Sequence, residues 1–391
     1  MLRNKLPFFL AAVKSKTAQP IFVEYIESTG DQWLDTGLYL DSYRIVIEAQ
    51  GTETPPSNYS ILCSHLRDYA GYALFAYSSD VWGLQSSALT TASIFEKTKL
   101  DATFDIVGGF PHAVLTINGE TKEYQRANVP SYPRHNIEIF SALASTHINK
   151  EFVGRVYGFQ IYSPDGNLLM DAKPCLHPKT LEVCMYDTVS KQYLYNQGTG
   201  SFIAGPRFIE YIKSTGTQYI DTGIKGTDIT RFVVKGTCVE NGVNNTQLLG
   251  GTSSSSQTFF GNRYTNSIAK WYCINSNSTS IGNPHNLSII DATIESDTSQ
   301  YGTLTDLVEG TVSEFIKFSG NTWSFSGSNL LIFGGYSSRR SPDATCYELQ
   351  LYTANGLVRH FKPCVDGNNV KCMYDLITGE YYYNQGAGEF E

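Results

Sequence analysis

The sequence predicts an all-β protein built from two tandem β-sandwich domains, because of its composition, an internal repeat and strand-like alternation. Charged residues make up 17% of the chain and aromatic residues 13%, led by 26 Tyr and 21 Phe, with 34 Gly among 391 residues. An average globular protein carries about 25% charged residues. This excess of aromatic and turn-forming residues favours short strands joined by polar turns over helical bundles.

A long repeat opens and closes each half of the chain. Residues 22–37, FVEYIESTGDQWLDTG, return as residues 208–223, FIEYIKSTGTQYIDTG, with 11 identities in 16 positions. Residues 173–202, KPCLHPKTLEVCMYDTVSKQYLYNQGTGSF, return as residues 362–390, KPCVDGNNVKCMYDLITGEYYYNQGAGEF. Matching beginnings and endings so far apart indicate a duplicated domain rather than a solenoid of short units.

The repeat sets the expected domain boundaries. We predict a first domain over residues 21–204 and a second over residues 207–391. They are joined at Ala204-Gly205-Pro206, where Pro and Gly suit a short linker. Residues 1–20 have no counterpart before the second copy, so we treat them as a separate N-terminal arm.

Within each copy, apolar and polar residues alternate at the period of a β-strand. Over residues 43–48, Tyr43, Ile45 and Ile47 fall on one side and Arg44, Val46 and Glu48 on the other, which predicts a half-buried strand. The same pattern predicts strands over residues 113–117, 137–140, 157–162 and 349–352. Outside the N-terminus no segment shows a convincing helical period. About a dozen short strands per repeat predict a two-sheet sandwich of the jelly-roll type.

Turn residues separate these strands. Asn118-Gly119 is the strongest short hairpin signal, and Pro164-Asp165-Gly166 matches Ala354-Asn355-Gly356 at the same point of each repeat. Gly379 follows the last Tyr-Asp pair and can adopt a left-handed turn conformation without steric cost.

The paired end motifs resemble a known module. The opening E-Y-I-x-S-T-G-x-Q followed by D-T-G, with the closing P-C…Y-D…Y-x-N-x-G-x-G-x-F, resembles a module of structural proteins from gut bacteriophages. That module is similar to the concanavalin A-like and laminin-G-like jelly-roll sandwich. The resemblance covers residues 22–390 in two copies and is specific only at their ends. It implies a virion surface location, as a fibre or decoration protein, with a role in adhesion or carbohydrate binding.

The repeated acidic residues admit a catalytic and a structural interpretation. Glu24 with Asp35, and Glu210 with Asp221, could form the two carboxylates of a glycosidase. Asp-Thr-Gly and Ser-Thr-Gly segments are also typical of side-chain-capped turns. Both segments persist in copies whose middles differ greatly. We therefore favour fold determinants and predict no catalytic residue.

Other candidates are weaker. Trp82 and Trp271 fall at similar places and could stack on a sugar ring, although a core position is the favoured interpretation. The pairs Cys175/Cys184 and Cys364/Cys372 flank a short loop in each copy. They admit a disulfide or a metal site, and we favour buried free thiols. Neighbouring His177 has no match in the second copy. We expect no cofactor and leave loop-bound calcium open.

The first twenty residues combine an apolar run with flanking basic residues. A secretory signal is one interpretation, but two Lys follow the short apolar run at once. A peptide that folds back on the first domain is another. We favour an anchor or oligomerisation arm, with an apolar face and cations meeting a polar or acidic partner. Its predicted contact residues are Arg3, Lys5, Leu6, Phe8, Phe9, Leu10 and Val13.

These observations favour a non-enzymatic virion protein over two alternatives, a carbohydrate-active hydrolase and a secreted bacterial lectin. The expected partners are phage capsid or tail proteins, host surface glycans and further copies of the chain, with a trimer as one candidate assembly. The net charge of -8 argues against a nucleic-acid partner. The sequence has no run of 18 or more apolar residues, so we predict no membrane insertion. Head and tail locations both stay open.

Overall fold

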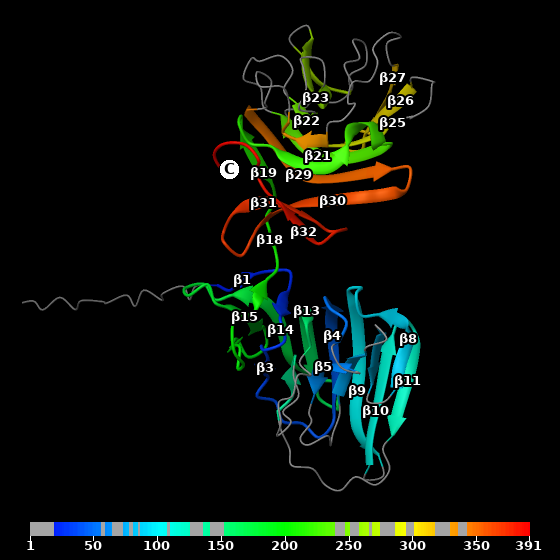
Figure 1. The fold of residues 1–391 in the computed structure, drawn as a ribbon, viewed down its shortest axis with the longest axis vertical. Coiled ribbons are helices and arrows are strands. Elements are labelled where there is room, and N and C mark those ends of the chain that lie inside the picture. The colour runs from blue at the N-terminus through cyan, green and yellow to red at the C-terminus, as the bar shows by residue number, and fades with distance from the viewer. Residues whose placement is uncertain are drawn as a thin grey trace, which may run out of the picture. The chain divides into compact units, whose positions relative to one another are not determined.

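The chain folds as two compact units, Met1–Ala204 and Gly205–Glu391. The computed structural model describes residues 19–55, 59–64, 73–77, 81–84, 87–107, 110–125, 136–140, 152–238, 247–250, 258–265, 268–273, 286–294, 301–316, 329–334 and 342–391. Within this part of the chain the elements are strands, apart from one 3-10 turn, η1 (Gly226–Asp228). The predicted all-β class is confirmed (Figure 1).

The first unit contains two antiparallel sheets. The main path of the large sheet runs β11 (Glu120–Gln125), β10 (Phe110–Ile117), β9 (Thr98–Val107), β4 (Tyr43–Gly51), β13 (Gly154–Tyr162), β14 (Leu168–Leu176), β15 (Val183–Asp187) and β16 (Tyr193–Leu194). Three short strands join its flank: β1 (Ile21–Phe22), β2 (Ile26–Ser28) and β17 (Ile203–Ala204). The small sheet runs β3 (Leu34–Asp35), β12 (Glu138–Ile139), β5 (Tyr59–Ser64), β6 (Ala73–Tyr77), β7 (Val81–Leu84) and β8 (Ser87–Ser93).

The second unit repeats this topology. Its large sheet runs β27 (Thr311–Ile316), β26 (Tyr301–Asp306), β25 (Ser288–Ile294), β21 (Arg231–Cys238), β29 (Pro342–Thr353), β30 (Gly356–Val365), β31 (Lys371–Asp375) and β32 (Glu380–Tyr382). The flanking strands are β18 (Arg207–Phe208) and β19 (Ile212–Thr215). The small sheet runs β20 (Ile220–Lys225), β28 (Asn329–Ile332), β22 (Gln247–Gly250), β23 (Thr258–Thr265) and β24 (Ile268–Cys273).

Each unit is a sandwich because its core lies between its two sheets. In the first unit Ile45 and Ile47 of the large sheet share one apolar cluster with Leu74 and Trp82 of the small sheet. In the second unit, Phe232 of β21 meets Phe260 of β23 with ring centroids 5.3 Å apart. Alternate residues of β21 are buried, as the period-two pattern predicts. The residues that alternate with the buried ones point away from the core and form the outer face of the large sheet.

The predicted turns have the expected backbone. Asn118 and Gly119 both take positive φ values, 49° and 82°, between β10 and β11, as a tight hairpin requires. Gly379 has φ 72°. One predicted strand is shorter than expected: β12 ends at Ile139, because buried Phe140 turns to φ 69°. Phe333 does the same after β28, with φ 56°. Bulky residues rarely adopt this conformation, so it is strained in both copies.

Candidate functional site

The repeated end motifs form a structural clasp that ties the beginning of each unit to its end. In the first unit the side-chain oxygen of Gln32 accepts from the Thr29 N–H at 2.8 Å, and its NH2 group donates to the carbonyl of Thr199 at 3.0 Å. The Asn196 Oδ1 atom accepts from the backbone N–H groups of Trp33 and Gly198, at 3.1 and 2.9 Å.

The second unit builds the same clasp from Gln218 and Asn384. Gln218 accepts from the Thr215 N–H at 2.8 Å and donates to the carbonyl of Glu389 at 3.1 Å. A Cβ atom added to Gly386 would lie 1.9 Å from the Thr217 carbonyl oxygen, so this position admits only Gly. The clasp explains why these motifs persist in both copies, and it supports their structural interpretation.

The acidic residues considered for catalysis are engaged in structural roles. Asp35 Oδ1 accepts from the Gly37 N–H at 2.7 Å, and Asp221 Oδ1 accepts from the Gly223 N–H at 2.8 Å. Asp35 also accepts from the side chain of Asn136 at 3.1 Å. Glu24 accepts from Lys97 at 3.1 Å. These contacts are the capped turns and surface pairs expected of fold determinants.

Within each of the two cysteine pairs, the two thiols face each other and are buried. Cys175 and Cys184 are directly opposed on β14 and β15, with Sγ atoms 3.6 Å apart, and the seven cysteines whose side chains are described are free and buried. Cys364 and Cys372 repeat the arrangement at 3.4 Å. The hydrogen bond with Cys184, together with burial, raises the pKa of the Cys175 thiol. Buried free thiols were the favoured interpretation, and no disulfide closes either loop.

A row of tyrosine rings lies against each cysteine pair. In the second unit Tyr374 and Tyr381 meet with centroids 5.0 Å apart, and Tyr381 stacks on Tyr383 at 6.1 Å. The first unit has Tyr186, Tyr193 and Tyr195 in the same row, joined by His177. Burial raises the pKa of Tyr381 far above its ordinary value. The thiols and most of the ring residues belong to the last three strands on the main path of each large sheet, and the four cysteines are not part of the main core clusters.

Trp82 is fully buried within the core of the first unit, which confirms the core interpretation. Trp33 is partly buried and packs against the same core. The side chain of Trp271 lies outside the described residues, although its backbone sits on β24, the counterpart of β7.

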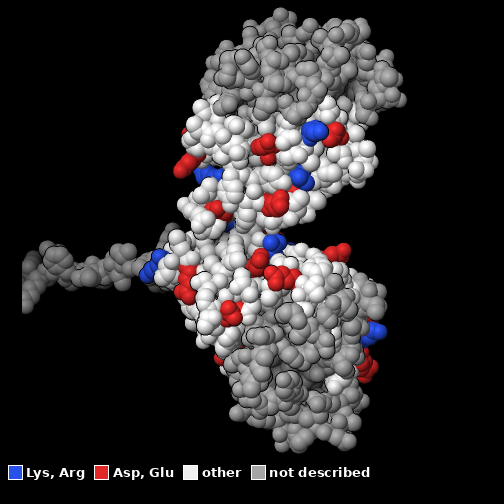
Figure 2. Space-filling view, viewed as in Figure 1, with Lys and Arg blue, Asp and Glu red and all other residues white. Residues whose placement is uncertain are grey.

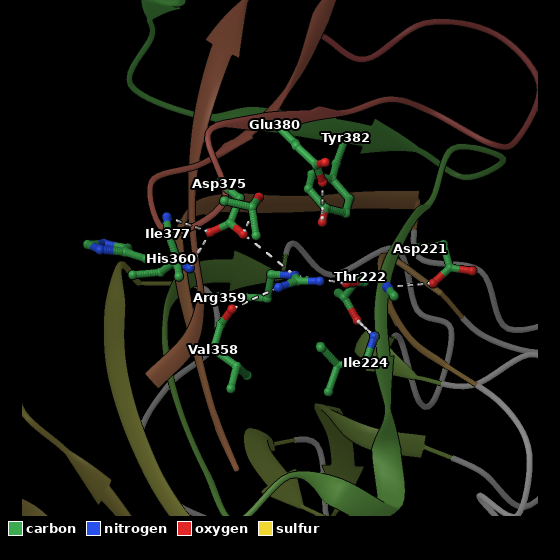
Figure 3. Close-up of polar contacts among 12 residues, drawn as sticks. Asp221, Thr222, Ile224, Val358, Arg359, His360, Asp375, Ile377, Glu380 and Tyr382 are labelled. Carbon is green, nitrogen blue, oxygen red and sulfur yellow. Dashed lines mark hydrogen bonds and ion pairs between the residues drawn. The ribbon is translucent and has the colours of Figure 1, made fainter. Parts of the chain in front are cut away.

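At the rim of the second sandwich, Arg359 connects the two sheets (Figure 3). Its guanidinium donates to the Thr222 carbonyl at 3.3 Å and lies 3.5 Å from the carboxylate of Asp375, which is fully buried. Asp375 also accepts from the His360 and Ile377 N–H groups, at 2.8 and 3.1 Å. These partners occupy the oxygen atoms of the Asp375 carboxylate, so we assign it a structural role.

The outer face of the large sheet carries a polar network that both units share. In the first unit Arg44 makes a two-point ion pair with Asp101, at 2.7 and 2.5 Å, and its guanidinium lies 5.2 Å from the centre of the Tyr162 ring. Tyr162 donates to Gln160 at 2.7 Å, and Gln160 donates to Asp171 at 3.2 Å.

In the second unit the equivalent residues are Arg231, Asp291, Tyr352 and Gln350. Arg231 pairs with Asp291 at 2.8 and 2.7 Å, and Tyr352 donates to Gln350 at 2.8 Å. Each face also holds a tyrosine pair, Tyr25 with Tyr157 and Tyr211 with Tyr347, at 5.5 and 5.4 Å. The two copies therefore retain an aromatic and hydrogen-bonding surface as well as a fold.

A hollow of about 360 Å³ lies on this face of the first unit. Its floor includes Gly158 on β13, and Phe22 stands beside it with 46% of its surface exposed. The charged and amide side chains that line it are Glu24, Glu48, Lys99, Gln160, Asp171 and Lys173. Acidic and basic groups are interspersed on the described surface that faces the viewer in Figure 2. A hollow with polar groups of both signs and nearby aromatic rings is the best candidate ligand site.

Sequence patterns did not single out this hollow. Its residues come from β1, β4, β9 and the β13–β14 hairpin, so they are spread over residues 22–24, 46–48, 99 and 157–174. The Gln-x-Tyr pair shared by the two copies, Gln160 with Tyr162 and Gln350 with Tyr352, was the available signal. In each pair the Gln and Tyr side chains lie on the outer face of the strand, and the residue between them is buried in the core.

Two predicted sites have no structural description. The arm residues Arg3, Lys5, Leu6, Phe8, Phe9, Leu10 and Val13 lie outside the described residues. Among the residues that are described, no group of three His, Cys, Asp or Glu side chains gathers as a metal site would. The same part of the chain contains no helix of the length and apolarity needed to cross a membrane.

Fold and surface together define a two-domain, all-β protein of the jelly-roll sandwich class with a candidate ligand site on one outer face. No family model matches the chain, and no curated protein matches its sequence. Among solved structures, domains LG4-5 of the mouse laminin alpha1 chain are similar, with 10% identity and a TM-score of 0.31, over 90% of this chain and 95% of that one.

The full extracellular region of zebrafish Gpr126/Adgrg6 is also similar, with 12% identity and a TM-score of 0.29. The match covers 56% of this chain and 30% of the zebrafish chain. Similarity at this level does not assign a function.

Proposed function

We propose that the chain is a non-enzymatic adhesion protein of a bacteriophage virion, a head fibre, capsid decoration or tail fibre component. The N-terminal arm attaches it to capsid or tail proteins, and the two sandwiches are displayed on the virion surface. There they adhere weakly to glycans of the host surface, with avidity supplied by several copies of the chain.

The observation that carries this proposal is the outer face shared by the two units. The two copies differ greatly in sequence between their end motifs, yet they keep the Arg–Asp–Tyr–Gln network and the tyrosine pair. Aromatic rings beside hydrogen-bonding side chains suit sugars, whose ring faces are apolar and whose edges carry hydroxyls. The phage origin rests on the resemblance of the end motifs alone.

The hydrolase alternative is less well supported. A glycosidase needs two carboxylates that face the same bond, one of them as a proton donor. Asp35 and Asp221 instead cap turns, and Glu24 pairs with Lys97. The secreted bacterial lectin would share the glycan-binding chemistry and differ in location.

Location is therefore the first test. Particles of the virus that encodes the chain are purified, labelled with an antibody against residues 207–391 and imaged by electron microscopy. Label at fixed points of the head supports a head fibre or decoration protein, and label at the tail tip supports a receptor-binding fibre. Particles without label, from a preparation in which the antibody recognises the purified chain, contradict the virion proposal and favour the bacterial lectin.

A further inference from the structure

Two residues that line the hollow of the first unit are replaced by larger ones at the matched positions of the second. Gly158 and Glu348 hold the same place in the two large sheets, Gly158 beside Glu48 and Glu348 beside Lys235. Asp171 pairs with Gln160, and His360 takes that place beside Gln350. The second unit therefore carries two larger side chains where the first has Gly and Asp.

These two side chains hold each other in place. The Nε2 atom of His360 lies 2.6 Å from Glu348 Oε1, and Gln350 contacts both groups, at 3.4 and 3.5 Å. Both Glu348 and His360 are only partly exposed, with 34% and 20% of their side-chain surface accessible. The pair occupies the position that stays open above Gly158 in the first unit.

The open hollow has the chemistry of a neutral hydroxyl-rich ligand. Carboxylates accept hydrogen bonds, lysines donate them and Gln160 does both. A strongly charged ligand would meet like charges whatever its sign, because Glu48 and Lys99 line the same space. Sugar hydroxyls both donate and accept, and the exposed ring of Phe22 offers an apolar surface to a pyranose face.

We infer that the hollow above Gly158 binds a neutral saccharide of one to a few rings, and that Glu348 and His360 close the equivalent place in the second unit. This inference rests on the proposed adhesive function. It adds the ligand class, the residues and a difference between the units: within the described residues, the first unit offers the open site and the equivalent place in the second unit is closed. The volume lies within the range of small-molecule pockets, about 300 to 1,000 Å³.

Val46 provides the sharpest test, because the repeat supplies its own control. Val46 lies on β4 in the hollow, and Val233 is its match on β21. Val46→Trp should fill the hollow and weaken binding at least about tenfold, roughly 1.4 kcal/mol. Val233→Trp places the same side chain on the other unit and should leave affinity unchanged. Circular dichroism and thermal unfolding verify that both variants fold.

Two further variants place the residues of one unit at the matched positions of the other. Gly158→Glu should also abolish binding, but Gly158 has φ 155° and an added Cβ would lie 3.3 Å from the Ala172 carbonyl, so this variant is strained. The double variant Glu348→Gly with His360→Asp should open the second hollow and raise the number of bound saccharides per chain from one to two.

The probe is an array of neutral di- to tetrasaccharides, followed by calorimetric titration of the full chain with the best responder. Loss of binding in Val46→Trp alone supports the inference. Equal affinity in wild type, Val46→Trp and Val233→Trp overturns the site while leaving glycan adhesion standing. Binding of acidic saccharides only overturns the ligand class. A wild-type chain that binds no saccharide overturns the inference and the adhesive function together, without touching the virion location.

Discussion

At the scale of single residues, buried carboxylates hold the end of each domain together. Asp187 is fully buried and accepts from the backbone N–H groups of Asp171, Val189 and Ser190, at 2.9, 3.0 and 2.9 Å. Burial alone would raise the pKa of Asp187, but the hydrogen bonds from Ser190, Asp171 and Val189 outweigh it and hold the pKa below its ordinary value.

Replacement of Asp187 tests this arrangement. Asp187→Asn should destabilise the first unit by about 1 to 3 kcal/mol at pH 7, because an NH2 group replaces an acceptor. The folded pKa is depressed, so the carboxylate stabilises the fold above about pH 4 and loses that effect as the pH falls below it. Denaturant unfolding at pH 7 and pH 3 should show a difference that shrinks at the lower pH.

The matched control is Asp165→Asn, at an exposed hairpin tip of the same unit. This variant should unfold like wild type at both pH values. A loss of stability in Asp187→Asn that does not change with pH would contradict the role assigned to the charge.

At the scale of elements, the clasp links the opening and closing segments of the second unit. Asn384 accepts from the N–H groups of Tyr219 and Gly386 and donates to the Gly388 carbonyl at 2.7 Å. It lies just beyond β32, and it holds the segment ahead of β20 against the chain end. The buried ring of Phe390 follows and packs on Phe333, with centroids 5.7 Å apart.

Removal of the Asn384 side chain should loosen both ends of the second unit at once. Asn384→Ala leaves several backbone groups without a partner, so the second unit should lose about 2 kcal/mol. Hydrogen exchange followed by mass spectrometry should show faster exchange in β18, β19 and β20 and no change in the first unit. Asn355→Ala, at an exposed turn, is the control; faster exchange in that variant as well would argue against the clasp.

At the scale of the whole molecule, the inferred restriction of saccharide binding to the first unit has a consequence for adhesion. Tandem sites within a chain would supply avidity without assembly, whereas a single weak site needs several copies of the chain. The proposed fibre or decoration role provides such copies, and the N-terminal arm is the predicted means of attachment.

Deletion of the arm tests the attachment. A chain without residues 1–19 keeps β1 and both sandwiches, so it should fold and bind saccharides with the affinity of the full chain. It should be missing from purified particles, because the predicted contacts of Phe8, Phe9 and their neighbours are gone. Immunoblots of particles assembled with either form measure this, and normal incorporation of the truncated chain would show that the arm is not the anchor.

The sequence by itself determined the class of fold, the existence of two related copies and the structural character of their shared motifs. These features are local: period two in β21 reports burial on one face, and Asn118-Gly119 or Asp35-Thr-Gly37 report a turn within a few residues. The strained backbone of Phe140 and Phe333 was not foreseen, because packing against Phe202 and Phe390, far away in the chain, maintains it.

Only the tertiary structure decided where a ligand could bind. The hollow needs β1, β4, β13 and β14 to place Phe22, Glu48 and Asp171 around Gly158, and of these residues only Gly158 and Asp171 come from consecutive strands. The two copies differ there by Gly158 against Glu348 and Asp171 against His360, substitutions that look ordinary in a repeat alignment. Their effect depends on which side chains meet across neighbouring strands, and strand pairing is a property of the folded sheet rather than of any one segment.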